Sequence, residues 1–140
     1  KNSDLIVDIG NWSRIDKTGI IFDSSTMFTL PNNAKRSPDV SWMTLEKWES
    51  VPPSERRRFS HVVPDFVIEL LSPTDYLPET QAKMEEYSEN GARLGWLIDP
   101  AEQKVHVYRQ NGEVEIMHDP EIVSGEDVLR GFELKVREIW

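Results

Sequence analysis

The stretch VPDFVIELLSPTD, Val63 to Asp75, decides how this sequence is read. Its apolar run, broken only by Glu69, is typical of a strand covered on both faces, and the proline-rich segment after it ends the strand. We therefore predict a central strand from about Asp65 to Leu71. A carboxylate is costly to bury unless it is paired or coordinated, so Glu69 becomes the first candidate functional residue.

The segments around this strand predict an α/β fold with a mixed sheet flanked by helices. The expected elements are a helix at about 3–17, a hairpin of strands 19–22 and 27–30, a strand within 37–43, a short helix and loop within 44–58, a crossover helix at about 79–89, a strand at 95–98, a hairpin around Asn111-Gly112, and a short strand or helix within 125–140. We expect the 37–43 and 95–98 strands to flank the central one, the latter in parallel.

Length and composition are those of one soluble globular domain spanning residues 1–140. The chain has 38% hydrophobic and 29% charged residues, and it contains no cysteine, which suits the cytoplasm. No apolar run reaches the 18 residues of a membrane span, so we expect no membrane association. Because the sequence starts at Lys1 rather than at a methionine, we expect the native chain to extend further upstream.

The net charge of −9 excludes a protein that coats nucleic acid through bulk electrostatics, since such binding depends on Lys and Arg. A local basic site remains compatible with this charge. The two basic clusters are Lys35-Arg36 and Arg56-Arg57-Arg58.

Two Pro-Asp dipeptides supply the acids that could accompany Glu69. Proline fixes the direction in which the next side chain leaves the strand, and Asp39 and Asp65 each follow one. The period of two also puts Asp65 on the face of Glu69. If Asp39 approached Glu69 from the neighbouring strand, the pair would make an oxygen site suited to Mg²⁺ or Mn²⁺. The alternative is that Asp39 and Asp65 only begin strands and cap turns.

Lys83 is the candidate for the positive charge that would accompany such a metal ion. It lies in the helix after the central strand, from which its long side chain could reach the end of that strand and stabilise a phosphate. The alternative is a solvated lysine paired with Glu79 and Glu86, at i−4 and i+3 on the same helix.

Several motifs in this order resemble the Uma family of restriction-endonuclease-like proteins, a group within the PD-(D/E)XK nuclease superfamily. They are GIIFDSSTMFTLPN, SPDVSWM, PDFVIELLSPTD, KMEEYSENGARLGWLIDP, VHVYR and LRGFELKV, and together they cover nearly the whole chain. The resemblance implies a restriction-endonuclease-like core and Mg²⁺-dependent hydrolysis of phosphodiester bonds.

The resemblance also implies roles for individual residues. Asp39 matches the motif aspartate and Glu69 the acid of the (D/E)XK strand, while Leu71 stands where the superfamily pattern has lysine. Lys83, from the following helix, matches the lysine that replaces it. Asp65 matches a second recurrent acid, which makes it a third candidate metal ligand. Asp4 corresponds to an acid that some superfamily members carry on the first helix.

Three functions remain open at this point. The first is a metal-dependent endonuclease acting on DNA, as a homodimer to which exposed Trp42, Trp48 and Trp140 contribute apolar contacts. The second is a non-catalytic domain of the same fold that serves as a dimerising or partner-binding module, which the net acidity favours. The third is hydrolysis of a small phosphorylated metabolite. Joint presence of Asp39, Glu69 and Lys83 favours the first.

Overall fold

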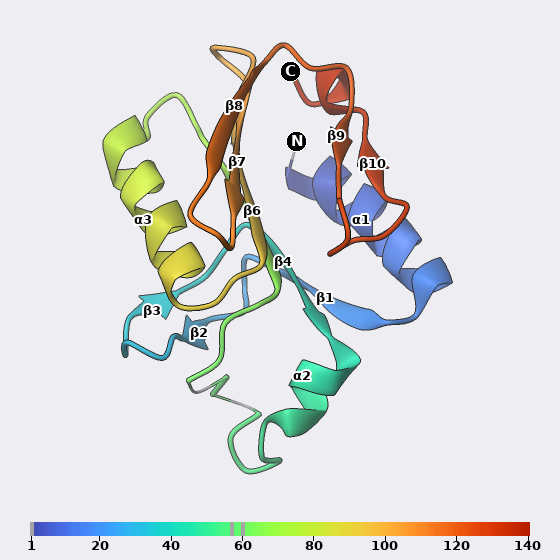
Figure 1. The fold of residues 1–140 in the computed structure, drawn as a ribbon, viewed down its shortest axis with the longest axis vertical. Helices are drawn as coiled ribbons and strands as arrows, with labels where there is room; N and C mark the ends of the chain where they lie inside the picture. The colour runs from blue at the N-terminus through green and yellow to red at the C-terminus, as the bar shows by residue number, and fades with distance from the viewer. Residues whose placement is uncertain (1, 57, 60) are drawn as a thin grey trace.

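The computed structural model describes residues 2–56, 58–59 and 61–140, so Arg57 of the second basic cluster lies outside the described residues. Figure 1 shows helices packed on both faces of a central sheet. The helices are α1 (Asn2–Asp16), α2 (Leu45–Ser50), α3 (Leu77–Glu89) and a 3₁₀ turn η1 (Val136–Glu138). The strands are β1 (Gly19–Asp23), β2 (Phe28–Thr29), β3 (Lys35–Arg36), β4 (Val40–Thr44), β5 (Phe66–Leu70), β6 (Leu94–Asp99), β7 (Lys104–Arg109), β8 (Val114–His118), β9 (Val123–Ser124) and β10 (Glu133–Leu134).

The predicted central strand is confirmed as β5. It lies inside a six-stranded sheet of order β1-β4-β5-β6-β7-β8. Its neighbours are β4, antiparallel with Val40 opposite Ile68, and β6, parallel with Ile68 opposite Trp96. The mixed α/β sheet and the parallel crossover through α3 are therefore as the sequence predicts.

Alternate residues of β5 enter two different cores, as the period of two requires. Phe66 and Ile68 pack with α1 and the C-terminal segment, whereas Val67 packs beneath α3 with Met84 and Tyr87. All five side chains are at most 1% exposed. Burial of each such apolar side chain contributes about 1.5–3 kcal/mol. Both cores thus fix β5 in place, and with it the position of Glu69.

Helix α3 begins at Leu77, two residues before the predicted start, with Pro78 in its first turn, and it ends where Asn90-Gly91 was expected to end it. The N–H of Gly91 donates to the carbonyl of Ser88, and the N–H of Ala92 donates to the carbonyl of Tyr87. Gly91 has φ of 111°, so this is the Schellman ending that favours glycine. The hairpin around Asn111-Gly112 is also confirmed, because β7 pairs antiparallel with β8.

The predicted hairpin of strands 19–22 and 27–30 is wrong. β1 pairs with β4, and β2 pairs instead with β3. The turn after Asp23 leads the chain away from the sheet, and Phe28 becomes fully buried against Phe22 and Phe59. Burial of this aromatic cluster under α3 determines the path, and local turn composition could not reveal it.

The predicted exposure of three tryptophans is also wrong. Trp42 is 2% exposed and packs edge-on against Trp12, while Trp48 and Trp140 are partly buried against the two cores. They do not form an apolar surface for dimerisation. Within the described parts of the chain, no helix is both long and apolar enough to span a bilayer.

Candidate metal centre

Glu69 occupies the C-terminal end of β5 and faces α3. Its side chain is 8% exposed, and Oε1 accepts a hydrogen bond of 2.8 Å from the hydroxyl of Tyr87. Tyr87 belongs to the buried face of α3 and is itself 1% exposed. The acid in the central strand is therefore held in a fixed orientation by a buried donor.

Asp39 comes to the same place from the neighbouring strand. Val40 is opposite Ile68, so one further step of this antiparallel register puts Asp39 opposite Glu69 on the same face of the sheet. The Oδ2 atom of Asp39 accepts a 2.7 Å hydrogen bond from the N–H of Leu70, which ties it to the end of β5. The structure thus brings together two acids that are 30 residues apart in the sequence.

Lys83 approaches this acid pair from α3. Its Nζ lies 3.8 Å from Oε1 of Glu69, and its side chain is 40% exposed. Lys83 and Tyr87 are four residues apart, so they lie on the same face of the helix and both reach Glu69. Tyr87 was not predicted from the sequence, although its spacing from Lys83 is the signal that would have identified it.

The surroundings make ionisation of Glu69 unfavourable. Burial raises the pKa of its carboxyl from 4.5 to about 7, the ammonium of Lys83 opposes that rise, and the nearby carboxylate of Asp39 adds to it. Burial and the adjacent Glu69 raise the pKa of the Tyr87 hydroxyl, which therefore stays a neutral donor. Two acids held together in this way would ionise more readily beside a cation.

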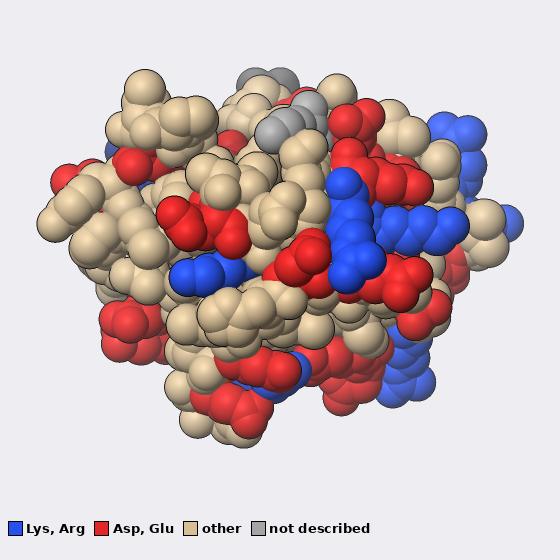
Figure 2. Space-filling view, turned by 90° about the horizontal axis from the view of Figure 1, so that it is seen from above, with Lys and Arg blue, Asp and Glu red and all other residues tan. Residues whose placement is uncertain are grey.

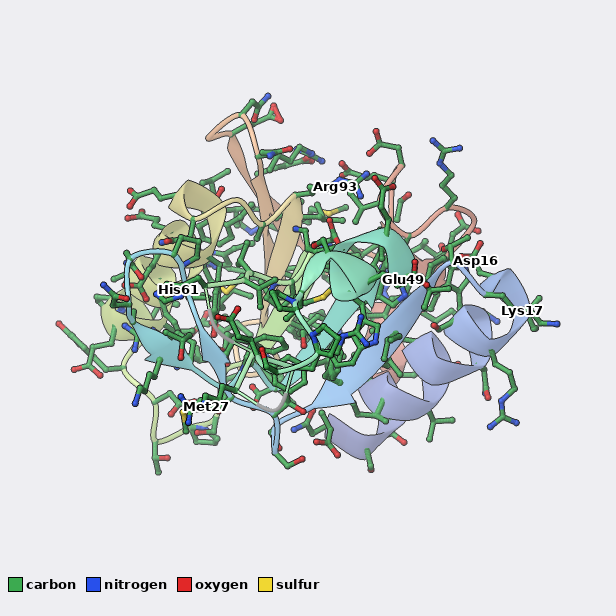
Figure 3. All side chains as sticks on the ribbon, turned by 90° about the horizontal axis from the view of Figure 1, so that it is seen from below. Asp16, Lys17, Met27, Glu49, His61 and Arg93 are labelled. Carbon is green, nitrogen blue, oxygen red and sulfur yellow. The ribbon has the colours of Figure 1, made fainter. Side chains whose placement is uncertain are left out.

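The structure does not bring Asp65 to this group. Asp65 lies before the other end of β5, four residues or roughly 13 Å from Glu69 along the strand. Its carboxylate accepts from the N–H of Thr44 at 2.9 Å and pairs with Lys47 at 3.3 Å and Arg93 at 3.6 Å. Figure 3 views this opposite side of the molecule and labels Arg93. Asp65 thus joins β4, α2 and the start of β6.

Asp4 is also remote from the acid pair. It belongs to α1, which packs on the face of the sheet opposite α3.

The charged residues around the acid pair carry both signs. Arg36, in the first of the two basic clusters, pairs with Glu86 of α3 at 2.6 Å. The loop after β5 contributes Asp75, whose pKa is lowered by hydrogen bonds from Ser72 and, to a smaller extent, by the charge of Lys83. Figure 2 looks onto the side where β5 ends and α3 begins, and acidic and basic side chains alternate there without a continuous basic stripe.

The donor set fits a hard divalent cation bound through few protein ligands. Mg²⁺ prefers oxygen, keeps several waters and is commonly held by one or two carboxylates together with substrate phosphates. Asp39 and Glu69 supply two carboxylates, each oriented through one oxygen, so the second oxygen of each is the candidate ligand atom. Among the described residues, no group of three or more His, Cys, Asp and Glu side chains could hold a metal ion.

Comparison with known proteins places this geometry in a family. The profile of the Uma2 family, described as "Putative restriction endonuclease", matches residues 1–137. Among solved structures, the chain is similar to a putative nuclease of DUF820 from Anabaena variabilis, with a TM-score of 0.83 and 23% identity over 99% of this chain and 76% of that one. No curated protein matched the chain. The chain thus belongs to the Uma2 family, and its fold is that of the nuclease-like structure it matches.

Proposed function

We propose that this chain is a metal-dependent endonuclease that hydrolyses phosphodiester bonds of DNA. Asp39 and Glu69 hold Mg²⁺ or Mn²⁺, and Lys83 acts on the phosphate. Membership in a family of restriction-endonuclease type supports nuclease chemistry, and such families generally depend on a divalent metal.

One observation carries the proposal: two carboxylates from adjacent strands converge beside a half-exposed ammonium. A structural ion pair would need only one acid for Lys83. The second acid makes Glu69 harder to ionise, so it weakens that pair when no metal ion is bound. Natural proteins retain such arrangements where function requires them.

The chemistry assigned to each residue follows from its contacts. A bound divalent ion would lower the pKa of an attacking water and neutralise charge on the phosphate. Tyr87 and the N–H of Leu70 keep the two carboxylates oriented. Lys83, whose side chain is 40% exposed, reaches solvent where a substrate phosphate would arrive, and its ammonium stabilises the negative charge of the transition state.

A cleavage assay tests this proposal. Supercoiled plasmid and a short single-stranded DNA are incubated with the protein in Mg²⁺, Mn²⁺, Ca²⁺ or EDTA. We expect cleavage in Mg²⁺ or Mn²⁺ only, and loss of at least a hundredfold in rate for Glu69→Gln and for Lys83→Met. Lys135→Met removes an exposed lysine near the C-terminus and should cleave like the wild type.

The pattern of losses separates the alternatives. Lys83→Met should keep the metal-induced rise in melting temperature, because Lys83 is assigned to the phosphate and not to the ion. If the wild-type protein cleaves no DNA in either metal, the non-catalytic partner-binding module becomes the better explanation. The mixture of acidic and basic side chains in Figure 2 is compatible with such a module.

A further inference from the structure

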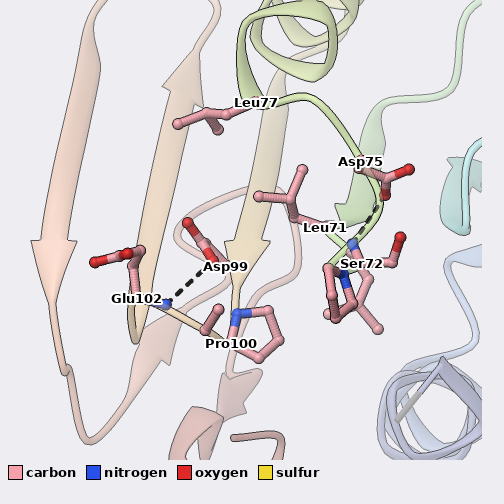
Figure 4. Close-up of a pocket in the computed structure, with 10 residues that line it drawn as sticks. Leu71, Ser72, Asp75, Leu77, Asp99, Pro100 and Glu102 are labelled. Atoms are coloured by element: carbon pink, nitrogen blue, oxygen red, sulfur yellow. Dashed lines mark hydrogen bonds between the residues drawn. The ribbon is translucent and has the colours of Figure 1, made fainter.

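A pocket of about 570 Å³ opens beside the acid pair, at the end of the parallel strands β5 and β6. This volume is within the range of about 300–1,000 Å³ that is typical of small-ligand sites, and strand ends of this kind are where α/β sheets bind ligands. Figure 4 shows Asp99 at the end of β6 with its carboxylate hydrogen-bonded to Glu102, Leu71 on the neighbouring loop, and Leu77 at the start of α3. The apolar part of the lining comes from Leu70, Leu71, Pro73, Leu77, Pro100 and Ala101.

Asp99 is the polar group built into this apolar lining. The residue is only 4% exposed, and its Oδ1 accepts one hydrogen bond, of 3.2 Å, from the N–H of Glu102. A carboxylate has about four acceptor positions, so this bond leaves most of its capacity for donors from a ligand. The pocket therefore suits a flat, largely apolar group that carries N–H donors.

The acidic side chains that line the pocket make a phosphate an unfavourable ligand there. Asp75, Asp99 and Glu102 all line it, whereas no lysine or arginine among the described residues does. The pocket nevertheless lies near the candidate metal centre, because Leu70 and Leu71 directly follow Glu69 and the charge of Lys83 acts on Asp75. A nucleic-acid strand whose phosphate lay at Lys83 would bring the neutral part of a nucleotide, its base, to this opening.

We propose that the pocket binds an unstacked guanine base of the nucleic-acid substrate next to the cleaved phosphate. The inference rests on the proposed nuclease function. Guanine alone among the common bases presents two adjacent donors, N1–H and the N2 amino group, which match the two oxygens of a carboxylate. Adenine and cytosine place an acceptor beside their amino donor, and that acceptor would face the charge of Asp99. The leucine and proline side chains cover the faces of the base.

The competing explanation is that Asp99 only caps the turn between β6 and β7. Its charge also acts on the buried His106 of β7, and Lys104 lies opposite it in the sheet, so such a role is physically reasonable. The two explanations differ in what Asp99→Asn changes. Asparagine keeps an oxygen that can accept from the Glu102 N–H, so the turn and the melting temperature should persist while paired recognition of guanine is lost.

The binding test compares the dinucleotides d(GpT) and d(IpT), because inosine lacks the N2 amino group. Affinities are measured by titration calorimetry on the full chain with Ca²⁺, which avoids cleavage. We expect the wild type to bind d(GpT) at least tenfold more tightly, and Asp99→Asn to reduce this ratio below threefold. Glu121→Gln, which removes an exposed acid elsewhere, should leave the ratio unchanged. Equal affinity for both dinucleotides, or no binding of either at millimolar concentration, overturns the inference.

Cleavage separates this inference from the proposed function. The substrates are single-stranded oligothymidylates that carry one guanine or one inosine. We expect wild-type cleavage to be strongest next to guanine and Asp99→Asn to cut without that preference. Cleavage that ignores the difference between guanine and inosine overturns the pocket assignment and leaves the nuclease in place. A protein that binds d(GpT) selectively yet cuts nothing retains the guanine pocket but is not a nuclease.

Discussion

Replacing Glu69 by Gln should stabilise the metal-free protein at alkaline pH. The carboxyl of Glu69 has a pKa of about 7 in the folded chain, against 4.5 for the ordinary group. Because the folded value is the higher one, the stabilising contribution of the protonated acid is fully present below about pH 4.5. It is lost as the pH rises through 7. A difference of this size corresponds to about 3 kcal/mol.

Glutamine reproduces the protonated state of Glu69 at every pH. Its side-chain oxygen can still accept from Tyr87, and only the ion pair with the half-exposed Lys83 is lost. We therefore expect Glu69→Gln to exceed the wild type in free energy of unfolding by about 2–3 kcal/mol at pH 8.5, and to equal it near pH 4.5. At about 3 °C per kcal/mol, the melting temperatures at pH 8.5 should differ by about 6–9 °C.

Divalent metal should remove most or all of this difference. An ion that binds only the folded wild type at a hundred times its dissociation constant adds about 2.7 kcal/mol, and Glu69→Gln should lose that gain. Protons compete for the same carboxylate, so the wild-type gain should decline as the pH falls below 7. The assay is thermal and urea unfolding in EDTA and in Mn²⁺, with Glu121→Gln as the control. A variant that is less stable than the wild type at pH 8.5, or that responds equally to Mn²⁺, would refute this reasoning.

Three further outcomes follow from the fold and the family. Val67→Asp places an unpaired charge under α3 and should lower the unfolding free energy by several kcal/mol, and a normal melting temperature would contradict the burial of β5. Asp65→Asn removes the charge that pairs with Lys47 and Arg93, so stability should fall by about 1–3 kcal/mol with the Mn²⁺ response intact; a lost response would make Asp65 a ligand after all. A homodimer, twice the 16.2 kDa of one chain, stays a prediction although the three tryptophans do not supply its interface; light scattering tests it, and a monomeric mass would contradict it.

The sequence predicted those parts of the fold that are encoded locally. The apolar run around Val67 defines β5, and Asn111-Gly112 defines the β7–β8 hairpin through a glycine with φ of 89°. The strands with which β1 and β2 pair, β4 and β3, could not be predicted in the same way. The pairing depends on where Phe28 is buried, and the partner of Phe28, Phe59, comes from a distant part of the chain.

The candidate site likewise has features that the local sequence predicts and others that depend on residues distant in the sequence. Periodicity correctly put Glu69 on a buried face, and two Pro-Asp dipeptides drew attention to Asp39 and Asp65. Periodicity predicts the face of the sheet on which a side chain lies. It does not predict which end of β5 an acid from the neighbouring strand will reach. The antiparallel register of β4 brings Asp39 to Glu69 and leaves Asp65 at the far end. No sequence pattern marked Asp99 as a candidate binding residue, because its proposed role depends on a pocket formed by two loops.

Anomalous scattering of Mn²⁺ in crystals of the wild-type protein tests the assignment of Asp39 and Glu69 as metal ligands. We expect one strong anomalous peak, within coordination distance of one carboxylate oxygen from Asp39 and one from Glu69, with Lys83 beside the ion and outside its ligand shell. The same peak should be absent from crystals of Glu69→Gln grown and soaked identically. A peak at Asp65 or at the pocket acids, or a peak that survives in Glu69→Gln, would contradict metal binding by Asp39 and Glu69.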